Sequence, residues 1–130
     1  MNVKSLKYYS LSAKEKRKVI DLIKKILSKE EQVLLAVIFG SFIELNSFRD
    51  IDIAIYSLNT TLNYLTELAV KIEEKLEIPV DVVPINDLPS KFKQYILVKG
   101  LVILEKNPGL YEALLSQVTD ELTLMRKLCK

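Results

Sequence analysis

The segment VLLAVIFGSFIELNSFRDIDIAIY, residues 33–56, holds two strand patterns joined by a loop that opens with glycine and serine. Residues 33–39 are a continuous apolar run of strand length, which is typical of a strand buried on both faces. Residues 50–56 alternate strictly, so three isoleucines point to one face while two aspartates and an alanine point to the other. The segment therefore predicts two strands, one of which carries a pair of carboxylates on a single face.

The paired aspartates are Asp50 and Asp52. Their Cα atoms are expected about 7 Å apart on a strand. Two ionised carboxylates at that separation repel each other, by about 1 kcal/mol in water and more in a dry site. A protein can raise one pKa, expose both groups to water, or hold a divalent cation between them. The pair therefore indicates either a solvated strand end or a metal site, and the spacing alone does not decide between them.

Gly40 and Ser41 follow the first strand directly. Glycine permits an unusual backbone turn and a close approach to a ligand. Ser41 is expected to cap the following turn and to leave backbone N–H groups and its hydroxyl facing an anion. The alternative interpretation is an ordinary strand-to-helix turn.

The remaining pattern predicts four strands and four helices, with Asp81 as a third strand carboxylate. The alternative interpretation of Asp81 is a solvent-exposed aspartate on an edge strand. Pro84, near the end of the same segment, is compatible with a strand end or an edge strand. A capping-box sequence at Ser12–Glu15 starts the first helix, and Pro79 stops the second. The expected strands are residues 33–39, 50–56, 80–85 and 101–104, and the expected helices begin near residues 12, 61, 87 and 108.

This order predicts one α/β (α+β) domain, a small mixed sheet covered by helices, spanning residues 1–130. The part that carries the motifs is about residues 30–105, and a C-terminal helix occupies about 108–128. Three glycines and no Gly/Ser linker argue against a second domain. The leucine stripe of the last helix has two interpretations: it packs on its own sheet, or it docks on a partner or a second copy of the chain.

The composition excludes several kinds of chemistry. The chain has no histidine and one cysteine, so Ser-His-Asp triads, His-ligated zinc and internal disulfides are ruled out. What remains is carboxylates, hydroxyls, lysines and a hard metal ion held by oxygen. The net charge of +2 gives no strong nucleic-acid signal, and the lysines of residues 14–25 are interpreted as a solvated helix face. The sequence has no apolar segment long enough to span a membrane, and its first ten residues lack the apolar core of a signal peptide. A cytoplasmic location is therefore expected.

Together these residues resemble a known family. Gly40-Ser41, eight residues, and then Asp50-Ile51-Asp52 with Asp81 on a later strand are similar to the signature of the polymerase-beta-like nucleotidyltransferase superfamily. The short length and the ending near residues 100–104 resemble its minimal nucleotidyltransferase branch. Many members of that branch are antitoxins paired with helical HEPN toxins. The chain departs from the family at Arg49, where serine is common.

The resemblance implies a role for each motif residue. Asp50, Asp52 and Asp81 would be the catalytic and metal-binding residues, holding Mg²⁺ in a two-metal site, and Asp81 would also help to deprotonate the acceptor. Gly40 and Ser41 would hold the phosphates of ATP.

Arg49 is a further phosphate contact in this interpretation. The expected reaction is Mg²⁺-dependent transfer of AMP from ATP to a hydroxyl of a partner HEPN toxin, expected to be a tyrosine. The other hypotheses are a catalytically weak antitoxin that neutralises its partner by contact, and a nucleotidyltransferase acting on a small molecule or an RNA end.

Overall fold

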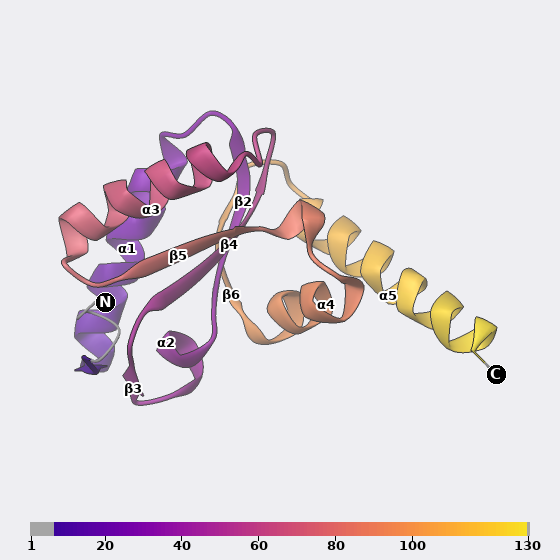
Figure 1. Ribbon diagram of the computed structural model, residues 1–130, viewed down its shortest axis with the longest axis horizontal. Helices are drawn as coiled ribbons and strands as arrows, with labels where there is room; N and C mark the ends of the chain where they lie inside the picture. Colours follow the sequence, from indigo (N-terminus) through magenta and orange to yellow (C-terminus); the bar gives the residue numbers. More distant parts are fainter. Residues whose placement is uncertain (1–6, 130) are drawn as a thin grey trace.

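The computed structural model describes residues 7–129 and confirms a mixed α/β domain (Figure 1). Helices and strands follow one another in the expected order, with four short additional elements. The elements are β1 (Tyr9–Ser10), α1 (Ala13–Ser28), β2 (Val33–Phe39), α2 (Ser41–Glu44), β3 (Ser47–Phe48), β4 (Ile51–Ser57), α3 (Leu62–Leu76), β5 (Val80–Pro84), the 3-10 helix η2 (Ile85–Asp87), α4 (Ser90–Lys99), β6 (Leu101–Glu105) and α5 (Leu110–Leu128).

The main sheet has four strands in the order β5-β4-β2-β6. β2 pairs antiparallel with both β4 and β6, whereas β4 pairs parallel with β5. The sheet is therefore mixed, as predicted. Pro84 is the last residue of the edge strand β5, where its missing N–H removes no central ladder bond.

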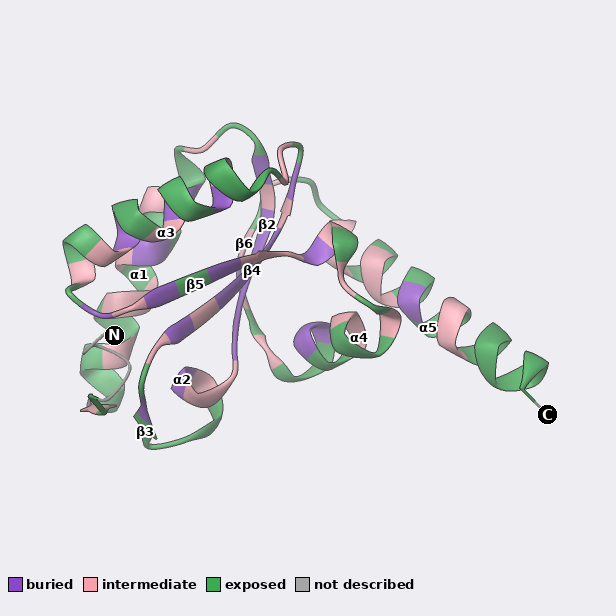
Figure 2. Ribbon diagram, viewed as in Figure 1, coloured by how far each residue is buried: buried purple, intermediate pink, exposed green. Residues whose placement is uncertain are grey.

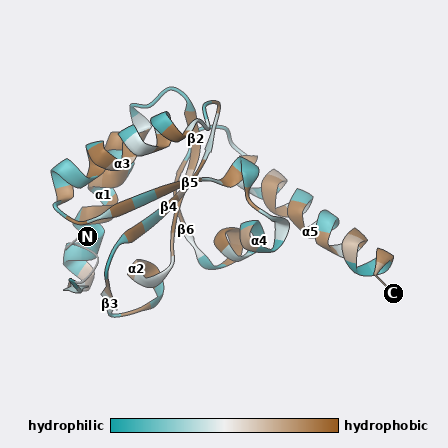
Figure 3. Ribbon diagram, viewed as in Figure 1, coloured by the Kyte–Doolittle hydropathy of each residue, from teal (hydrophilic) through white to brown (hydrophobic). Residues whose placement is uncertain are grey.

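Helices cover both faces of this sheet (Figure 1). The core on one face joins α1 and α3 to the isoleucines of β4, and the core on the other joins α4 and α5 to alternate residues of β2. β2 is accordingly buried on both faces, with only Leu34 half-buried. In Figure 3, α1 and α3 each carry hydrophobic and hydrophilic residues, consistent with one face of each helix packing on the sheet.

The residues next to two helix starts determine where those helices begin. α1 begins with the predicted capping box, in which Ser12 and Glu15 bond each other's backbone N–H groups. The next-to-last helix was predicted from the start signal Asp87-Leu88-Pro89, and α4 begins directly after that signal, at Ser90. Leu88 precedes a proline and is extended, with φ −83° and ψ 151°, because proline disfavours helical geometry in the preceding residue.

The leucine stripe of α5 packs on the chain's own sheet along the first part of the helix. Val118 is buried there, and Leu110, Leu114 and Leu122 pack around it. The end of the helix is different, because Met125 is 50% exposed. Figure 2 shows this end as mostly exposed turns leading away from the sheet.

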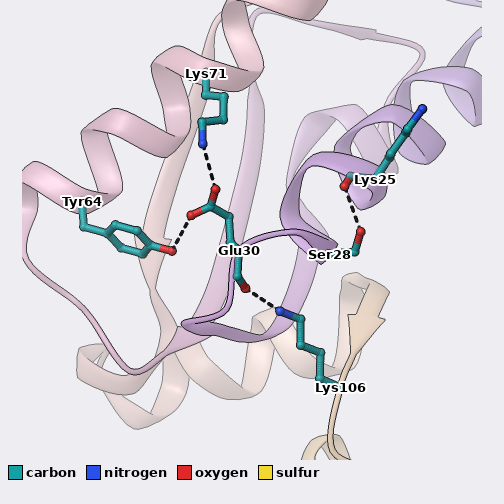
Figure 4. A network of polar contacts seen from close by, with 6 residues as sticks. All are labelled: Lys25, Ser28, Glu30, Tyr64, Lys71 and Lys106. Carbon is teal, nitrogen blue, oxygen red and sulfur yellow. Dashed lines mark hydrogen bonds and ion pairs between the residues drawn. The ribbon is translucent and has the colours of Figure 1, made fainter.

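Glu30 ties together three elements at the end of the sheet where β2 begins (Figure 4). Its carboxylate accepts hydrogen bonds from Tyr64, at 3.0 Å, and from Lys71, at 2.8 Å, both on α3. Its backbone carbonyl accepts from Lys106, just after β6. The bond from Lys71 most of all, and then the bond from Tyr64 and the charges of Lys71 and Lys106, lower the pKa of the Glu30 carboxyl group. None of the described helices is long and apolar enough to cross a membrane.

Candidate active site

The central residue of the candidate site is Asp52, the second residue of β4. In the strand register its Cα pairs with Phe39 of β2 on one side and with Asp81 of β5 on the other. Asp50 lies just before β4. Because side chains alternate along a strand, Asp52 and Asp81 share the sheet face that α4 and α5 cover. The fold thus brings Phe39 of β2, Asp52 of β4 and Asp81 of β5 side by side, with Asp50 just before β4.

Gly40 lies against the Asp52 carboxylate. A Cβ on residue 40 would stand 2.6 Å from Asp52 Oδ2, and the backbone has φ 79° and ψ −154°, where side chains are rarely tolerated. Gly40 thus has a close neighbour, but that neighbour is the chain's own carboxylate, and the approach of a ligand to Gly40 stays a prediction. Any side chain here would displace Asp52.

The predicted cap role of Ser41 is wrong. Gly40 occupies the N-cap of α2, and Ser41 is its first helical residue. The Gly40 carbonyl accepts backbone bonds from Ile43, at 3.1 Å, and Glu44, at 3.0 Å. Glycine takes the cap position because only it can adopt this φ/ψ pair without strain, and the serine is thereby moved one residue into the helix.

The three aspartates form one electrostatic group. The pKa of Asp52 is raised from 3.8 to about 6, first by burial and then by the charges of Asp50 and Asp81. Desolvation and like charges both disfavour the ionised form of a carboxyl group. Three outcomes were expected for two close carboxylates: a shifted pKa, exposure to water or a bound cation. The raised pKa of Asp52 is the first of these.

No group of three or more histidine, cysteine, aspartate or glutamate side chains within residues 7–129 is arranged to hold a metal ion by itself. Asp50 and Asp52 nevertheless provide the oxygen ligands that Mg²⁺ prefers. Mg²⁺ in proteins commonly uses one or two carboxylates and completes its coordination with substrate phosphates and water. The donor set therefore fits a cation that arrives with a phosphate-bearing substrate.

An open hollow of about 320 Å³ lies beside this group. Ser41 and Asp50 line it, together with Arg49, whose guanidinium lies 4.9 Å from the ring centre of Tyr8. Arg49 is exposed and belongs to the loop that precedes β4. The structure thus brings Ser41, Arg49 and Asp50 to one depression at the surface.

Lys16 is a residue near the site that the sequence argument missed. Its Nζ donates to the carbonyls of Phe42, at 2.7 Å, and Leu45, at 3.0 Å, and lies 5.1 and 5.7 Å from the ring centres of Phe42 and Phe48. The interpretation of a solvated lysine face is therefore wrong for this lysine. A signal was present: Lys16 precedes Val19, Ile20 and Ile23 at helical spacing, so it falls on the apolar face of α1.

An aromatic group borders the site on the side of α4. Phe39, the last residue of β2, packs edge-on against Phe92 and Tyr95. The Tyr95 hydroxyl donates to a carboxylate oxygen of Glu44, the last residue of α2. These aromatic residues also went unnoticed in the sequence, because the helical pattern of α4 is weak and gives no sign of which face it buries.

A comparison with protein-family models identifies the class of protein as a nucleotidyltransferase. A family model described as "Polymerase beta, Nucleotidyltransferase" matches residues 21–109, which is more than half of the chain. The chain therefore belongs to the polymerase beta nucleotidyltransferase family. A comparison with curated protein sequences finds no match.

Solved structures show the same fold. A chain of the MntA–HepT toxin–antitoxin structure has a TM-score of 0.70 at 20% identity, covering 85% of this chain and 90% of that one. A toxin–antitoxin structure with AMP-PNP has a TM-score of 0.71 at 23% identity, covering 83% and 90%. A complex of a tri-AMPylated HEPN toxin with an MNT antitoxin, from Shewanella oneidensis, has a TM-score of 0.70 at 21% identity, covering 86% and 90%.

Proposed function

We propose that this chain is a minimal nucleotidyltransferase of the antitoxin type, which transfers AMP from ATP to a hydroxyl of a partner HEPN toxin. The observation that carries the proposal is the Gly40–Asp52 contact with Asp81 as its strand neighbour, because it places a family motif around one shielded carboxylate. Support for the partner and the nucleotide comes from similar structures, one with AMP-PNP and one with a tri-AMPylated HEPN toxin.

In the proposed reaction the acceptor oxygen forms a bond to the α-phosphorus of ATP. The bond from that phosphorus to the oxygen bridging to the β-phosphorus breaks, and pyrophosphate leaves. Asp81, exposed on its edge strand, takes the proton of the acceptor hydroxyl. The acceptor proton goes to Asp81, the adenylyl group goes to the acceptor oxygen, pyrophosphate carries away the bonding electrons of the broken P–O bond, and no redox step is needed.

Asp50 and Asp52 are the proposed ligands of Mg²⁺, and Asp81 is assigned to complete a second metal position. Mg²⁺ ions bound there supply charge stabilisation to the attacking and leaving oxygens. The backbone of Gly40 and Ser41 is assigned to the β- and γ-phosphates, and Arg49 is assigned as a further phosphate contact. Burial and the two neighbouring carboxylates disfavour the ionised form of Asp52, so a bound cation is expected to lower its pKa again.

The experiment that tests the function follows the label from ATP. The chain and Mg²⁺ are incubated with a candidate HEPN partner protein, sought among the products of neighbouring genes, and with ATP labelled in the α- or the γ-phosphate. We expect label on the HEPN protein from α-labelled ATP alone, since only the α-phosphorus is transferred. Asp52→Asn and Asp81→Asn should abolish the signal, and Asp21→Asn, on the exposed side of α1, should leave it unchanged.

The same variants separate the two rival functions. If Asp52→Asn still neutralises the partner toxin, the chain acts by contact and the transfer proposal is wrong. The exposed apolar end of α5, with Leu124, Met125 and Leu128, would then be the first surface to alter. If label appears on RNA or on a small molecule when the HEPN protein is absent, the chain is a nucleotidyltransferase that acts on a small molecule or an RNA end.

A further inference from the structure

Two aromatic side chains on α4 are exposed to solvent. Phe92 is 39% exposed and Tyr95 is 37% exposed. Their rings are stacked, with centroids 6.2 Å apart and planes 17° apart, so they form one continuous aromatic surface. Exposed apolar area of this kind is unfavourable in water unless a ligand or a partner covers it.

This surface adjoins the catalytic carboxylate through a single residue. Phe39 lies edge-on to both rings, with centroids 5.8 Å from Phe92 and 6.4 Å from Tyr95. The Cα of Phe39 pairs with that of Asp52 in the β2–β4 register, and Gly40 follows it directly. A ligand whose phosphate lies at Asp52 therefore has an aromatic surface about one side chain away.

The aromatic surface is also connected to the loop after Gly40. Glu44 ends α2 and accepts a hydrogen bond from the Tyr95 hydroxyl. The pKa of Tyr95 is raised, chiefly by this hydrogen bond and to a small extent by the charge of Asp52. The hydroxyl thus stays protonated as a donor, and the ring is held at a fixed distance from the loop. Preorganised rings lose little entropy when a second ring stacks on them.

We propose that Phe92 and Tyr95 form the nucleobase subsite of the enzyme, stacking the base of the nucleoside triphosphate whose phosphates lie at Asp50 and Asp52. This inference rests on the proposed function in that it takes a nucleoside triphosphate as the substrate. The subsite offers ring faces and few polar groups, so it selects by stacking strength rather than by hydrogen-bond pattern. Purine triphosphates, with their larger rings, therefore bind more tightly than pyrimidine triphosphates.

The test measures binding without turnover, so that it is independent of the acceptor. The dissociation constants of AMP-PNP and of inorganic tripolyphosphate, each with Mg²⁺, are measured by calorimetry for the whole chain and its variants. Phe92→Leu and Tyr95→Leu should weaken AMP-PNP binding roughly 5- to 100-fold, which is the range for one lost base stack, and leave tripolyphosphate binding unchanged. Tyr95→Phe keeps the ring and should weaken AMP-PNP binding far less.

Leu58→Ala is the matched control, because Leu58 is 72% exposed and follows the opposite end of β4 from the aspartates. Thermal melting of each variant shows that it is folded. An AMP-PNP affinity within twofold of wild type in both leucine variants overturns the inference. Normal AMP-PNP binding combined with lost labelling of the HEPN protein also overturns it, and assigns the aromatic surface to the acceptor protein.

The two proposals fail in different ways. If no HEPN protein is labelled but the leucine variants still lose AMP-PNP affinity selectively, the acceptor assignment is wrong and the base subsite is supported. If wild type binds tripolyphosphate and AMP-PNP equally well, the base contributes nothing and the subsite is overturned, whatever the acceptor is.

Discussion

Gly40 and Asp52 touch across the β2–β4 pair, so closely that a Cβ on residue 40 would lie 2.6 Å from Asp52 Oδ2. The glycine turn and Asp52, the second aspartate of the motif, are therefore packed against each other rather than being two independent motifs. Asp52 is partly buried, and this burial is the largest cause of its raised pKa. The spacing between Gly40 and Asp52 thus brings the glycine against the carboxylate, where a larger side chain would not fit.

Gly40→Ala is expected to impair both stability and catalysis. The new methyl group must displace Asp52, and alanine is strained at φ 79°, at a cost of roughly 1–3 kcal/mol. Gly109→Ala is the matched control, since Gly109 has φ 88° but nothing within 4 Å of its missing Cβ. We expect it to lose roughly 1–2 kcal/mol from its left-handed backbone and to keep full transfer activity. Chemical denaturation and labelling from ATP measure the two effects, and equal activity in both variants would contradict the steric argument.

Asp52→Asn is expected to stabilise the chain while it abolishes transfer. The pKa of Asp52 is about 6 in the folded chain, against an ordinary value of 3.8. The folded state therefore binds more protons between these pH values, and the free energy of unfolding falls as the pH rises through them. The variant lacks this loss, so it should melt at a higher temperature than wild type at pH 7.5 in metal-free buffer. The difference should shrink towards pH 4, and a lower melting temperature for the variant at pH 7.5 would rule out the electrostatic explanation.

The sequence predicted the layered fold well because its signals are local. The continuous apolar run of residues 33–39, the alternation of residues 50–56 and the capping box at Ser12 each specify one element through its neighbours in the chain. The four short additional elements were not predicted, because segments of two to four residues show no hydrophobic periodicity. The helix-start signal at residues 87–89 predicted α4 closely, and Pro89 is the N-cap of that helix rather than one of its helical residues.

The site was predicted by residue type but not by geometry. The alternation placed Asp50 and Asp52 on one strand, yet nothing local shows that Asp81 becomes the Cα partner of Asp52, because strand order is a long-range property. The close approach at Gly40 was expected for a ligand and proved to involve a carboxylate of the chain. The aromatic surface on α4 depends on tertiary packing and left no motif.

Glu30→Gln is expected to destabilise the chain without changing the site. The carboxylate bonds to Lys71 and Tyr64 hold α3 to the turn before β2, and they lower the pKa of Glu30. A lowered pKa in the folded state gives stability that is present above about pH 4.5 and is lost as the pH falls through the folded value. Thermal melting should therefore show a deficit for the variant at pH 7 that closes at acidic pH. Affinity for AMP-PNP should be unchanged, and a loss of affinity would show that this network reaches the site.

Lys16→Met is expected to loosen the loop that follows Gly40. Lys16 donates to two carbonyls around α2, and its ammonium group lies over the buried rings of Phe42 and Phe48. Methionine keeps most of the apolar packing but leaves both carbonyls without this donor, at a cost of about 1–3 kcal/mol in the free energy of unfolding. Because the same loop positions Gly40 against Asp52, the Michaelis constant for ATP should rise as well.

Lys14→Met serves as the comparison for this loop, since Lys14 is exposed on the same helix. It should change neither the free energy of unfolding nor the Michaelis constant by a measurable amount, because an exposed lysine contributes little. Lys16→Arg, which keeps a charged donor, should recover part of the ATP affinity that Lys16→Met loses. If the methionine variant is destabilised but its Michaelis constant is unchanged, Lys16 only stabilises the fold and does not position the loop.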